Sequence, residues 1–206
     1  MPVVTMVAGP NGSGKSTMIR ILTQAGIDFG EYLNADDIAA TLRGPAGEVS
    51  LKAQVEVRRR RENALQEGRD HSFETVLSHP SHIDHLRACK ARGFEVIVYF
   101  VATDNPSINR GRVANRVVHG GHDVPADRIV NRYYRSIANL PAAIAVADQG
   151  LVFDNSSDAN PMVVIAEIHR GYTIESNLPA PPPRWWSDLW HEHVSASPPD
   201  KPSEAP

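Results

Sequence analysis

A glycine-rich run near the start of the chain has the residue types and spacing that phosphate binding requires. The run comprises Gly9, Pro10, Asn11, Gly12, Ser13, Gly14, Lys15, Ser16 and Thr17. It fits the pattern G-x-x-x-x-G-K-[ST], in which a curled loop points backbone N–H groups at phosphate oxygens and the next helix adds the positive end of its dipole. In this pattern Lys15 reaches the β- and γ-phosphates, and the Ser16 hydroxyl binds Mg²⁺. The run therefore predicts a site for a nucleoside triphosphate.

Two carboxylates further along are candidates for the chemistry of phosphoryl transfer. Asp36 follows residues 32–34, an expected strand, and the carboxyl ends of strands in open α/β sheets face the ligand crevice. Its carboxylate could take the proton from an attacking hydroxyl, or Asp36 or Asp37 could instead cap the next helix. Glu74 lies within the apolar residues 72–76, where a buried carboxylate needs a partner. It could hold a substrate hydroxyl or help to bind Mg²⁺ through water, or it could lie on the polar face of its strand.

Arginines on either side of Gly120 and Gly121 form the third candidate group. Arg112 and Arg116 are four residues apart and therefore share a helix face. Beyond the glycines, the arginines recur at i, i+4 and i+7, at Arg128, Arg132 and Arg135. Two such rows around a glycine hinge could form a lid that binds phosphate oxygens, with Arg116 and Arg132 as the main candidates. The alternative is that these arginines are solvated, as most helix arginines are.

The order of apolar runs and helical patterns predicts the elements that position these residues. Strand patterns cover residues 3–7, 32–34, 72–76, 94–101, 151–153 and 162–165. Helical patterns follow the glycine-rich run and cover residues 35–42, 50–67, 83–91, about 106–119, 126–139 and 141–147. This alternation is typical of an α/β fold with a mostly parallel sheet, in which the nearly all-apolar residues 94–101 form a central strand.

The composition changes sharply after residue 178. Residues 179–206 hold 8 of the 16 prolines and all 3 tryptophans of the chain. We expect one folded domain over residues 1–178, with the lid at about 105–139, and a disordered tail over residues 179–206. The tail would carry one apolar segment able to bind other surfaces, formed by Trp185, Trp186, Leu189 and Trp190.

Charge and cysteine content narrow the class of protein. With 21 Lys and Arg against 24 Asp and Glu, the chain lacks the basic excess of a dedicated nucleic-acid binder. The single cysteine, Cys89, excludes an internal disulfide framework and fits a reducing compartment. The chain shows no run of membrane-spanning length and no signal pattern, so we expect a cytoplasmic protein without a membrane partner. We also expect Cys89 to fill the core, and no metal site at His79, His82 and His85, because no carboxylates join them at a ligand spacing.

The ordered set of motifs closely resembles the zeta-toxin-like P-loop kinases, over about residues 3–155. The resemblance is carried by residues 9–17, Asn34-Ala35-Asp36, Phe73-Glu74-Thr75, Gly120-Gly121-His122-Asp123-Val124-Pro125, Arg132-Tyr133 and Asn139-Leu140. It implies the P-loop kinase fold, an α/β doubly wound, mostly parallel sheet with a helical, arginine-bearing lid. It also implies ATP and Mg²⁺ as cofactors.

The resemblance assigns a role to each candidate residue. Asp36 becomes the general base, Lys15 a ligand of the γ-phosphate and Ser16 the Mg²⁺ ligand. Glu74 contacts the substrate hydroxyl, with Asp36 and Thr75 also in the substrate site. The last assignment makes Arg116 and Arg132 the phosphate clamps.

Characterised toxins of this family phosphorylate the 3′-hydroxyl of the amino sugar in UDP-N-acetylglucosamine and are neutralised by a small antitoxin. The chain is similar to the short chromosomal branch, because it is compact between residue 74 and the lid. The resemblance to the family as a whole implies an ATP- and Mg²⁺-dependent kinase of a nucleotide sugar, with UDP-N-acetylglucosamine as the expected acceptor. The resemblance to the short branch leaves open whether the acceptor is the same and whether the protein is the toxin of a toxin–antitoxin pair. Two alternatives stay open: the same fold acting on another acceptor, such as NAD or a nucleotide, and an ATP-binding switch module with slow hydrolysis.

Overall fold

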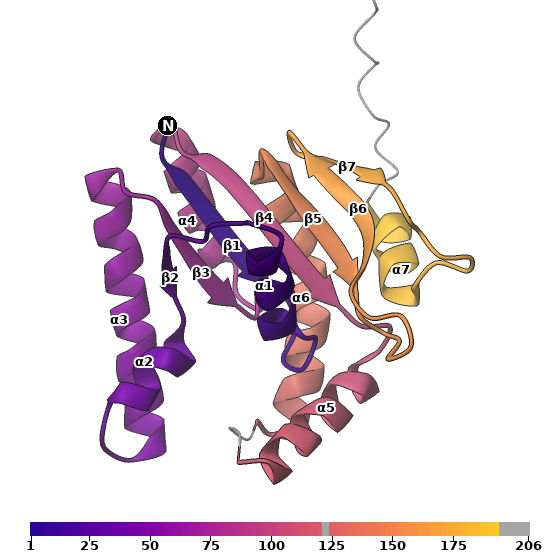
Figure 1. Ribbon diagram of the computed structural model, residues 1–206, viewed down its shortest axis with the longest axis horizontal. Coiled ribbons are helices and arrows are strands. Elements are labelled where there is room, and N and C mark those ends of the chain that lie inside the picture. Colours follow the sequence, from indigo (N-terminus) through magenta and orange to yellow (C-terminus); the bar gives the residue numbers. More distant parts are fainter. Residues whose placement is uncertain (121–123, 194–206) are drawn as a thin grey trace, which may run out of the picture.

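The computed structural model describes residues 1–120 and 124–193 and shows one seven-stranded sheet with helices on both faces (Figure 1). The strands are β1 Val3–Ala8, β2 Glu31–Leu33, β3 His71–Thr75, β4 Glu95–Ala102, β5 Gln149–Asp154, β6 Val163–His169 and β7 Tyr172–Glu175. Their order is β2-β3-β1-β4-β5-β6-β7. The first five strands of this order are parallel to one another. Strand β6 pairs antiparallel with β5, and β7 pairs antiparallel with β6. The expected α/β fold with a mostly parallel sheet is confirmed.

The helices divide between the two faces of the sheet. They are α1 Lys15–Gln24, α2 Ala35–Thr41, α3 Ala46–Glu67, α4 Ser81–Ala91, α5 Pro106–Val118, α6 Ala126–Val146 and α7 Arg184–His193. Alternate strand residues point to opposite faces, so Val98 packs in the core that includes α4, α6 and α7, whereas Tyr99 packs in the smaller core that includes α1. Among the helices of the described part of the chain, none is both long and apolar enough to cross a membrane.

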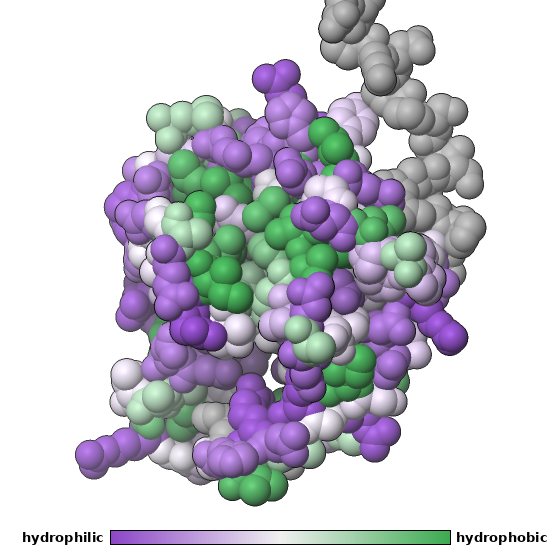
Figure 2. All heavy atoms as spheres, turned by 45° about the vertical axis from the view of Figure 1, so that its right-hand side comes forward, coloured by the Kyte–Doolittle hydropathy of each residue, from purple (hydrophilic) through white to green (hydrophobic). Residues whose placement is uncertain are grey.

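The face that carries α1 is only partly covered by helices. A shallow hollow of about 440 Å³ lies over β4, β5 and β6, and its lining includes Ile97, Leu151 and Ile174. Figure 2 shows apolar side chains at the surface on this side of the molecule, among hydrophilic ones. The other face, under α4 and α6, is where most of the buried apolar side chains lie.

Residues 184–193 differ from the expected disordered tail, because they form α7. Trp185 and Trp186 are only 3% and 1% exposed and belong to the main core. Their indole N–H groups donate to Asp154 Oδ1 at 2.9 Å and to Glu175 Oε1 at 3.0 Å. Burial of two large aromatic side chains with satisfied N–H groups stabilises a helix that composition alone does not predict. The side chain of Trp190 and residues 194–206 lie outside the described part.

Two smaller expectations about the elements were wrong. Residues 126–139 and 141–147 were expected as separate helices, but α6 runs through Pro141 without a break. Leu140 and Ala143, on either side of this proline, are fully buried, and tertiary packing of this kind overrides a local helix breaker. The edge strand β7 was not expected, because its residues Tyr172–Glu175 alternate over only four positions.

Candidate active site

The glycine-rich loop joins the carboxyl end of β1 to the start of α1, near the centre of the sheet (Figure 1). Its backbone packs too closely against its neighbours to accept side chains at two positions. A Cβ atom on Gly9 would lie 2.1 Å from the carbonyl oxygen of Val101, and one on Gly12 would lie 2.6 Å from that of Asn109. Gly14, directly before α1, has a φ of 103°, which L side chains rarely adopt. Close packing and left-handed turns therefore require these glycines.

Two buried asparagines, which sequence reasoning missed, hold this loop. The Asn109 amide in α5 donates to the carbonyl oxygen of Asn11 at 2.6 Å, and the Asn155 amide, directly after β5, donates to that of Ser13 at 2.8 Å. Asn155 follows a strand at its carboxyl end, the same position that indicated Asp36, so this signal was available for it. Asn109 lies inside a helix pattern and gives no comparable signal.

The amino group of Lys15 is folded against its own loop. Its Nζ atom donates to the carbonyl oxygens of Gly9 at 2.9 Å and Pro10 at 3.2 Å, and lies 3.7 Å from Glu74 Oε1. Burial lowers the pKa of Lys15, while the negative charges of Glu74 and Asp36 oppose that shift. Lys15 is thus a buried cation with an acidic partner directly across the site.

Glu74 lies on β3, beside the loop, and its carboxylate has several partners. The Tyr32 hydroxyl donates to Glu74 Oε2 at 2.7 Å, and the Asn34 amide donates to the same oxygen at 3.3 Å. Burial, and then the charge of Glu74, raise the pKa of Tyr32 well above its usual range, so this phenol stays a donor. Glu74 therefore faces the loop as a fixed, half-buried carboxylate, and not the solvent.

Asp36 occupies the first turn of α2. It does not cap this helix, because Asn34 takes that position. The side chain of Asn34 accepts a hydrogen bond from the Asp36 backbone N–H at 2.8 Å, so Asn34 is the N-cap. The Asp36 side chain is exposed, yet its charge acts on Lys15. Asp37 is also exposed, in the same turn.

The arginines of the expected lid do not all face the same way. Arg132 of α6 donates to Asn11 Oδ1 at 3.5 Å, and the charge of Arg116 in α5 acts on Lys15. Two helices therefore bring one arginine each to the loop. Arg116, Arg128 and Arg135 are all exposed, so exposure alone does not separate Arg116 from the other two. The lid residues Gly121, His122 and Asp123 lie outside the described part of the chain.

Arg112 and Thr75 make contacts that the sequence did not indicate. Arg112 donates to the carbonyl oxygen of Asn155 at 2.8 Å and pairs with Asp158 at 2.8 Å, so it braces the segment after β5. The Thr75 hydroxyl accepts the backbone N–H of Leu77 at 2.9 Å, within the turn after β3. Both side chains are thus engaged in shaping the segments that surround the loop.

The loop keeps polar groups that suit a triphosphate and a metal ion. The buried Ser13 hydroxyl has no hydrogen-bond partner among the described residues. Ser16 and Thr17 are exposed in the first turn of α1, at the helix end whose dipole attracts anions. Ser16 offers a hydroxyl oxygen, the ligand type that Mg²⁺ prefers. These residues fit a nucleoside triphosphate with Mg²⁺.

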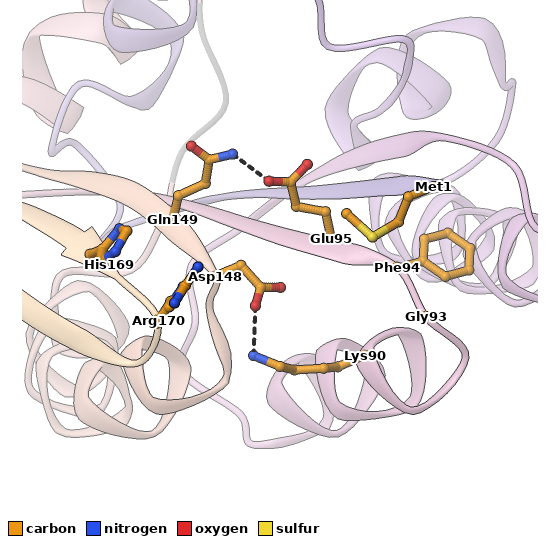
Figure 3. A pocket seen from close by; sticks show the side chains of 9 residues that line it. All are labelled: Met1, Lys90, Gly93, Phe94, Glu95, Asp148, Gln149, His169 and Arg170. Carbon is orange, nitrogen blue, oxygen red and sulfur yellow. Dashed lines mark hydrogen bonds and ion pairs between the residues drawn. The ribbon is translucent and has the colours of Figure 1, made fainter. Parts of the chain in front are cut away.

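A hollow of about 490 Å³ at the opposite edge of the sheet is a poor candidate for the same site (Figure 3). Three of its charged groups already have partners, because Lys90 Nζ lies 3.0 Å from Asp148 Oδ1 and the Gln149 amide donates to Glu95 at 2.5 Å. In open α/β sheets, ligands bind outside the carboxyl ends of the strands, where the loop of Lys15 lies. The loop of Lys15 is therefore a better candidate for the active site than this hollow.

Fold and loop together define an α/β protein with a phosphate-binding loop at the carboxyl edge of a mostly parallel sheet. The family model for zeta toxin matches residues 1–160, and the chain belongs to the zeta toxin family. An uncharacterised protein of Haemophilus influenzae is 28% identical over 129 residues, which are 61% of this chain and 88% of that protein.

Two solved structures have a similar fold. The AvrRxo1-ORF1:-ORF2 structure with ATP matches with a TM-score of 0.68 at 16% identity, over 97% of this chain and 66% of that chain. A structure of the PezAT chromosomal toxin–antitoxin system of Streptococcus pneumoniae matches with a TM-score of 0.56 at 16% identity, over 79% of this chain and 71% of that one. The chain thus spans slightly less than two thirds of the length of the AvrRxo1 chain it matches.

Proposed function

We propose that this protein is an ATP- and Mg²⁺-dependent phosphotransferase that acts on a hydroxyl group of a small molecule. Membership of the zeta toxin family supports a phosphotransferase. The observation that carries the proposal is the convergence of Lys15 with Glu74, Asp36 and Arg116 beside a phosphate-binding loop. A simple nucleotide-binding module needs the loop and the lysine, but it has no need for two carboxylates on the acceptor side.

Lys15 and Glu74 would change partners when the nucleotide binds. Backbone N–H groups of the loop would hold the phosphates, and the Lys15 amino group would move from Glu74 and the loop carbonyls to the γ-phosphate. The released Glu74 carboxylate, still held by Tyr32, could then accept a hydrogen bond from the acceptor hydroxyl. Mg²⁺, held through Ser16, would neutralise charge on the β- and γ-phosphates.

Asp36 would act as the general base. Its carboxylate is exposed at the carboxyl end of β2, where it can reach an acceptor lying over the loop and take its proton. Arg116 and Arg132, from the two lid helices, would neutralise charge on the transferred phosphoryl group. Closure of these helices would also exclude water, which limits futile hydrolysis of ATP.

The acceptor we propose is the 3′-hydroxyl of a nucleotide sugar, with UDP-N-acetylglucosamine as the first candidate. Support comes from the family to which the chain belongs and from hydrogen-bonding groups at Tyr32, Asn34 and Glu74 on the acceptor side. We also propose a small antitoxin as a partner, since a structure with a similar fold is described as a toxin–antitoxin system.

The test is an ATP-consumption assay with purified protein and Mg²⁺, run with and without UDP-N-acetylglucosamine, with mass spectrometry of the products. We expect consumption to rise several-fold with the acceptor and a product heavier by one phosphate. Steady ATP turnover without such a product would exclude this acceptor and lead to NAD and other nucleotides. Slow turnover that no acceptor accelerates would contradict a kinase and favour the switch module.

A further inference from the structure

Three side chains of the types that bind transition metals meet in the core, away from the glycine-rich loop. They are His71, the first residue of β3, and His85 and Cys89, one turn apart on α4. All three are buried, and their ligand atoms lie within 4.8 Å of one another. The loop and Glu74 lie toward the other end of β3, so nothing in the proposed phosphotransfer uses this group.

Two of the three spacings between the ligand atoms are close to those around one shared ion, and the third, between His71 and Cys89, is no more than 4.8 Å. Nε2 of His71 lies 3.0 Å from Nε2 of His85, and the latter lies 3.6 Å from Cys89 Sγ. In a tetrahedral zinc site, with bonds of about 2.0–2.1 Å to nitrogen and 2.3 Å to sulfur, neighbouring ligand atoms lie roughly 3.3–3.6 Å apart. Only small side-chain movements would separate the two nitrogens to that distance.

The His71 ring is oriented as a metal-bound histidine is. Nδ1 of His71 lies 3.0 Å from the carbonyl oxygen of Arg69 and can donate to it, which leaves the Nε2 lone pair directed at His85 and not at solvent. A hydrogen bond of this kind fixes the tautomer and direction of metal-bound histidines. The rings of Phe73 and Phe94 pack edge-on against the two histidines, so the group lies in a largely apolar shell.

We propose that His71, His85 and Cys89 bind a transition metal ion of the zinc class through two imidazole nitrogens and one thiolate. On binding, the Cys89 thiol loses its proton to solvent, and its sulfur forms the bond to the ion. Nitrogen and sulfur ligands select such ions over Mg²⁺, which prefers oxygen. No fourth His, Cys, Asp or Glu of the described residues joins the group, so the ion has these three protein ligands and a water molecule would complete its tetrahedron.

The Arg61 side chain opposes the site and therefore helps to test it. It is buried, its Nη1 lies 2.8 Å from His82 Nδ1, and its guanidinium lies 4.6 Å from the centre of the Phe73 ring. Its positive charge acts on His71, His85 and Cys89 and would repel an ion bound there, and the Cys89 thiolate offsets only one of the two charges on that ion. Arg61→Met should therefore strengthen metal binding several-fold, provided that the variant folds.

The test is to refold the full chain from denaturant with Co²⁺ alone, remove loose metal and record the absorption spectrum. Cys89 is the chain's single cysteine, so a thiolate-to-cobalt charge-transfer band can come only from this sulfur. Co²⁺ at the Ser16 site has oxygen ligands and cannot produce that band. This readout needs no phosphotransfer, so failure of the proposed function would leave it unaffected.

We expect one retained Co²⁺ per chain, tetrahedral visible bands, and a charge-transfer band that Zn²⁺ displaces. His79→Gln, a histidine outside the group, should keep the band, and Cys89→Ser should lose it while binding metal more weakly. Wild-type protein that refolds to its native circular dichroism with Co²⁺ or Zn²⁺, yet retains no metal and shows no thiolate band, would overturn the proposal. The wild-type result alone decides whether the proposal holds, so misfolding of a variant does not affect the outcome of the test.

Discussion

The amino group of Lys15 and the carboxylate of Glu74 lie 3.7 Å apart, at the carboxyl ends of the neighbouring strands β1 and β3. The Lys15 side chain is 8% exposed and the Glu74 side chain 17%, so this pair is largely shielded from water and the attraction is stronger than at a surface. In the absence of ligand, the Glu74 carboxylate opposes the lowering of the Lys15 pKa that burial causes. The pair places the phosphate ligand and the acceptor contact side by side before either substrate arrives.

Loss of the Glu74 charge should slow phosphotransfer. Glu74→Gln can keep a hydrogen bond to Tyr32 but cannot hold Lys15 or attract the acceptor proton, so we expect turnover to fall by roughly 10²-fold. Without the opposing carboxylate, the pKa of Lys15 should fall further, because burial then acts with less compensation. Steady-state kinetics decide this. Glu95→Gln, at the opposite edge of the sheet, is the matched control and should remain active.

Of two arginines on α6, only the one that reaches the glycine-rich loop should matter for turnover. Arg132→Gln removes the guanidinium that reaches Asn11 and should lower turnover by about 10²-fold, as loss of a donor to developing charge does. Arg128→Gln changes an exposed side chain one turn earlier and should change turnover less than about two-fold. Equal effects of the two substitutions would show that the lid acts through net charge alone.

Asn155 should support nucleotide binding from outside the motif. Asn155→Ala removes the bond to the Ser13 carbonyl and leaves that buried acceptor unpaired, a loss of about 1–3 kcal/mol in stability. Because the unpaired carbonyl belongs to the loop, we expect weaker ATP binding as well as a lower melting temperature. Calorimetric titration with ATP measures the first effect. Asn160→Ala, at an exposed site in the same connection, should leave both quantities unchanged.

The α7 helix should stabilise the site through Asp154, the last residue of β5. Trp185 donates to Asp154 Oδ1, and the backbone N–H of Arg184 donates to Asp104 at 2.6 Å, after β4. Trp185→Phe keeps an aromatic ring but loses the bond to Asp154, so we expect about 1 kcal/mol less stability and a higher KM for ATP. Trp186→Phe loses a bond to Glu175 instead and should lower stability without raising that KM.

Removal of the whole segment after Leu178 gives a stronger version of the same prediction. Deletion takes away the buried Trp185, Trp186 and Leu189 and exposes the core beneath them. We expect a large loss of stability in chemical denaturation, together with loss of activity. Full activity and unchanged stability of the shortened chain would show that α7 is dispensable.

The sequence predicted what short-range patterns encode and missed what tertiary packing decides. The loop of Lys15 and the strand that carries Glu74 were predictable, because the motif and the apolar alternation are local. Asn155 could have been singled out by its position after a strand, whereas Asn109 could not be ranked above other asparagines until the fold brought it to the loop. Composition indicated disorder after residue 178, yet Trp185 found a buried partner in Asp154.

The grouping of His71 with His85 and Cys89 was missed for a related reason. The histidines considered as a metal site from the sequence were His79, His82 and His85, which are close together along the chain. In the structure, His79 lies near Ser81 and His82 near Arg61, whereas the partner of His85 comes from β3. Spacing along one helix could supply the pair four residues apart, but only the packing of α4 on the sheet supplies the third side chain.

The most direct test of the central claim is the comparison of Asp36→Asn with Asp37→Asn, two neighbouring and exposed carboxylates of the same helix turn. The measured quantities are ATP affinity and the rate of phosphate transfer to the acceptor that the assay identifies, or acceptor-independent ATP turnover if none is found. We predict that Asp36→Asn keeps ATP affinity and lowers transfer by about 10²–10⁴-fold, as loss of a general base does, while Asp37→Asn stays close to wild type. Unchanged turnover in Asp36→Asn would contradict the proposed mechanism.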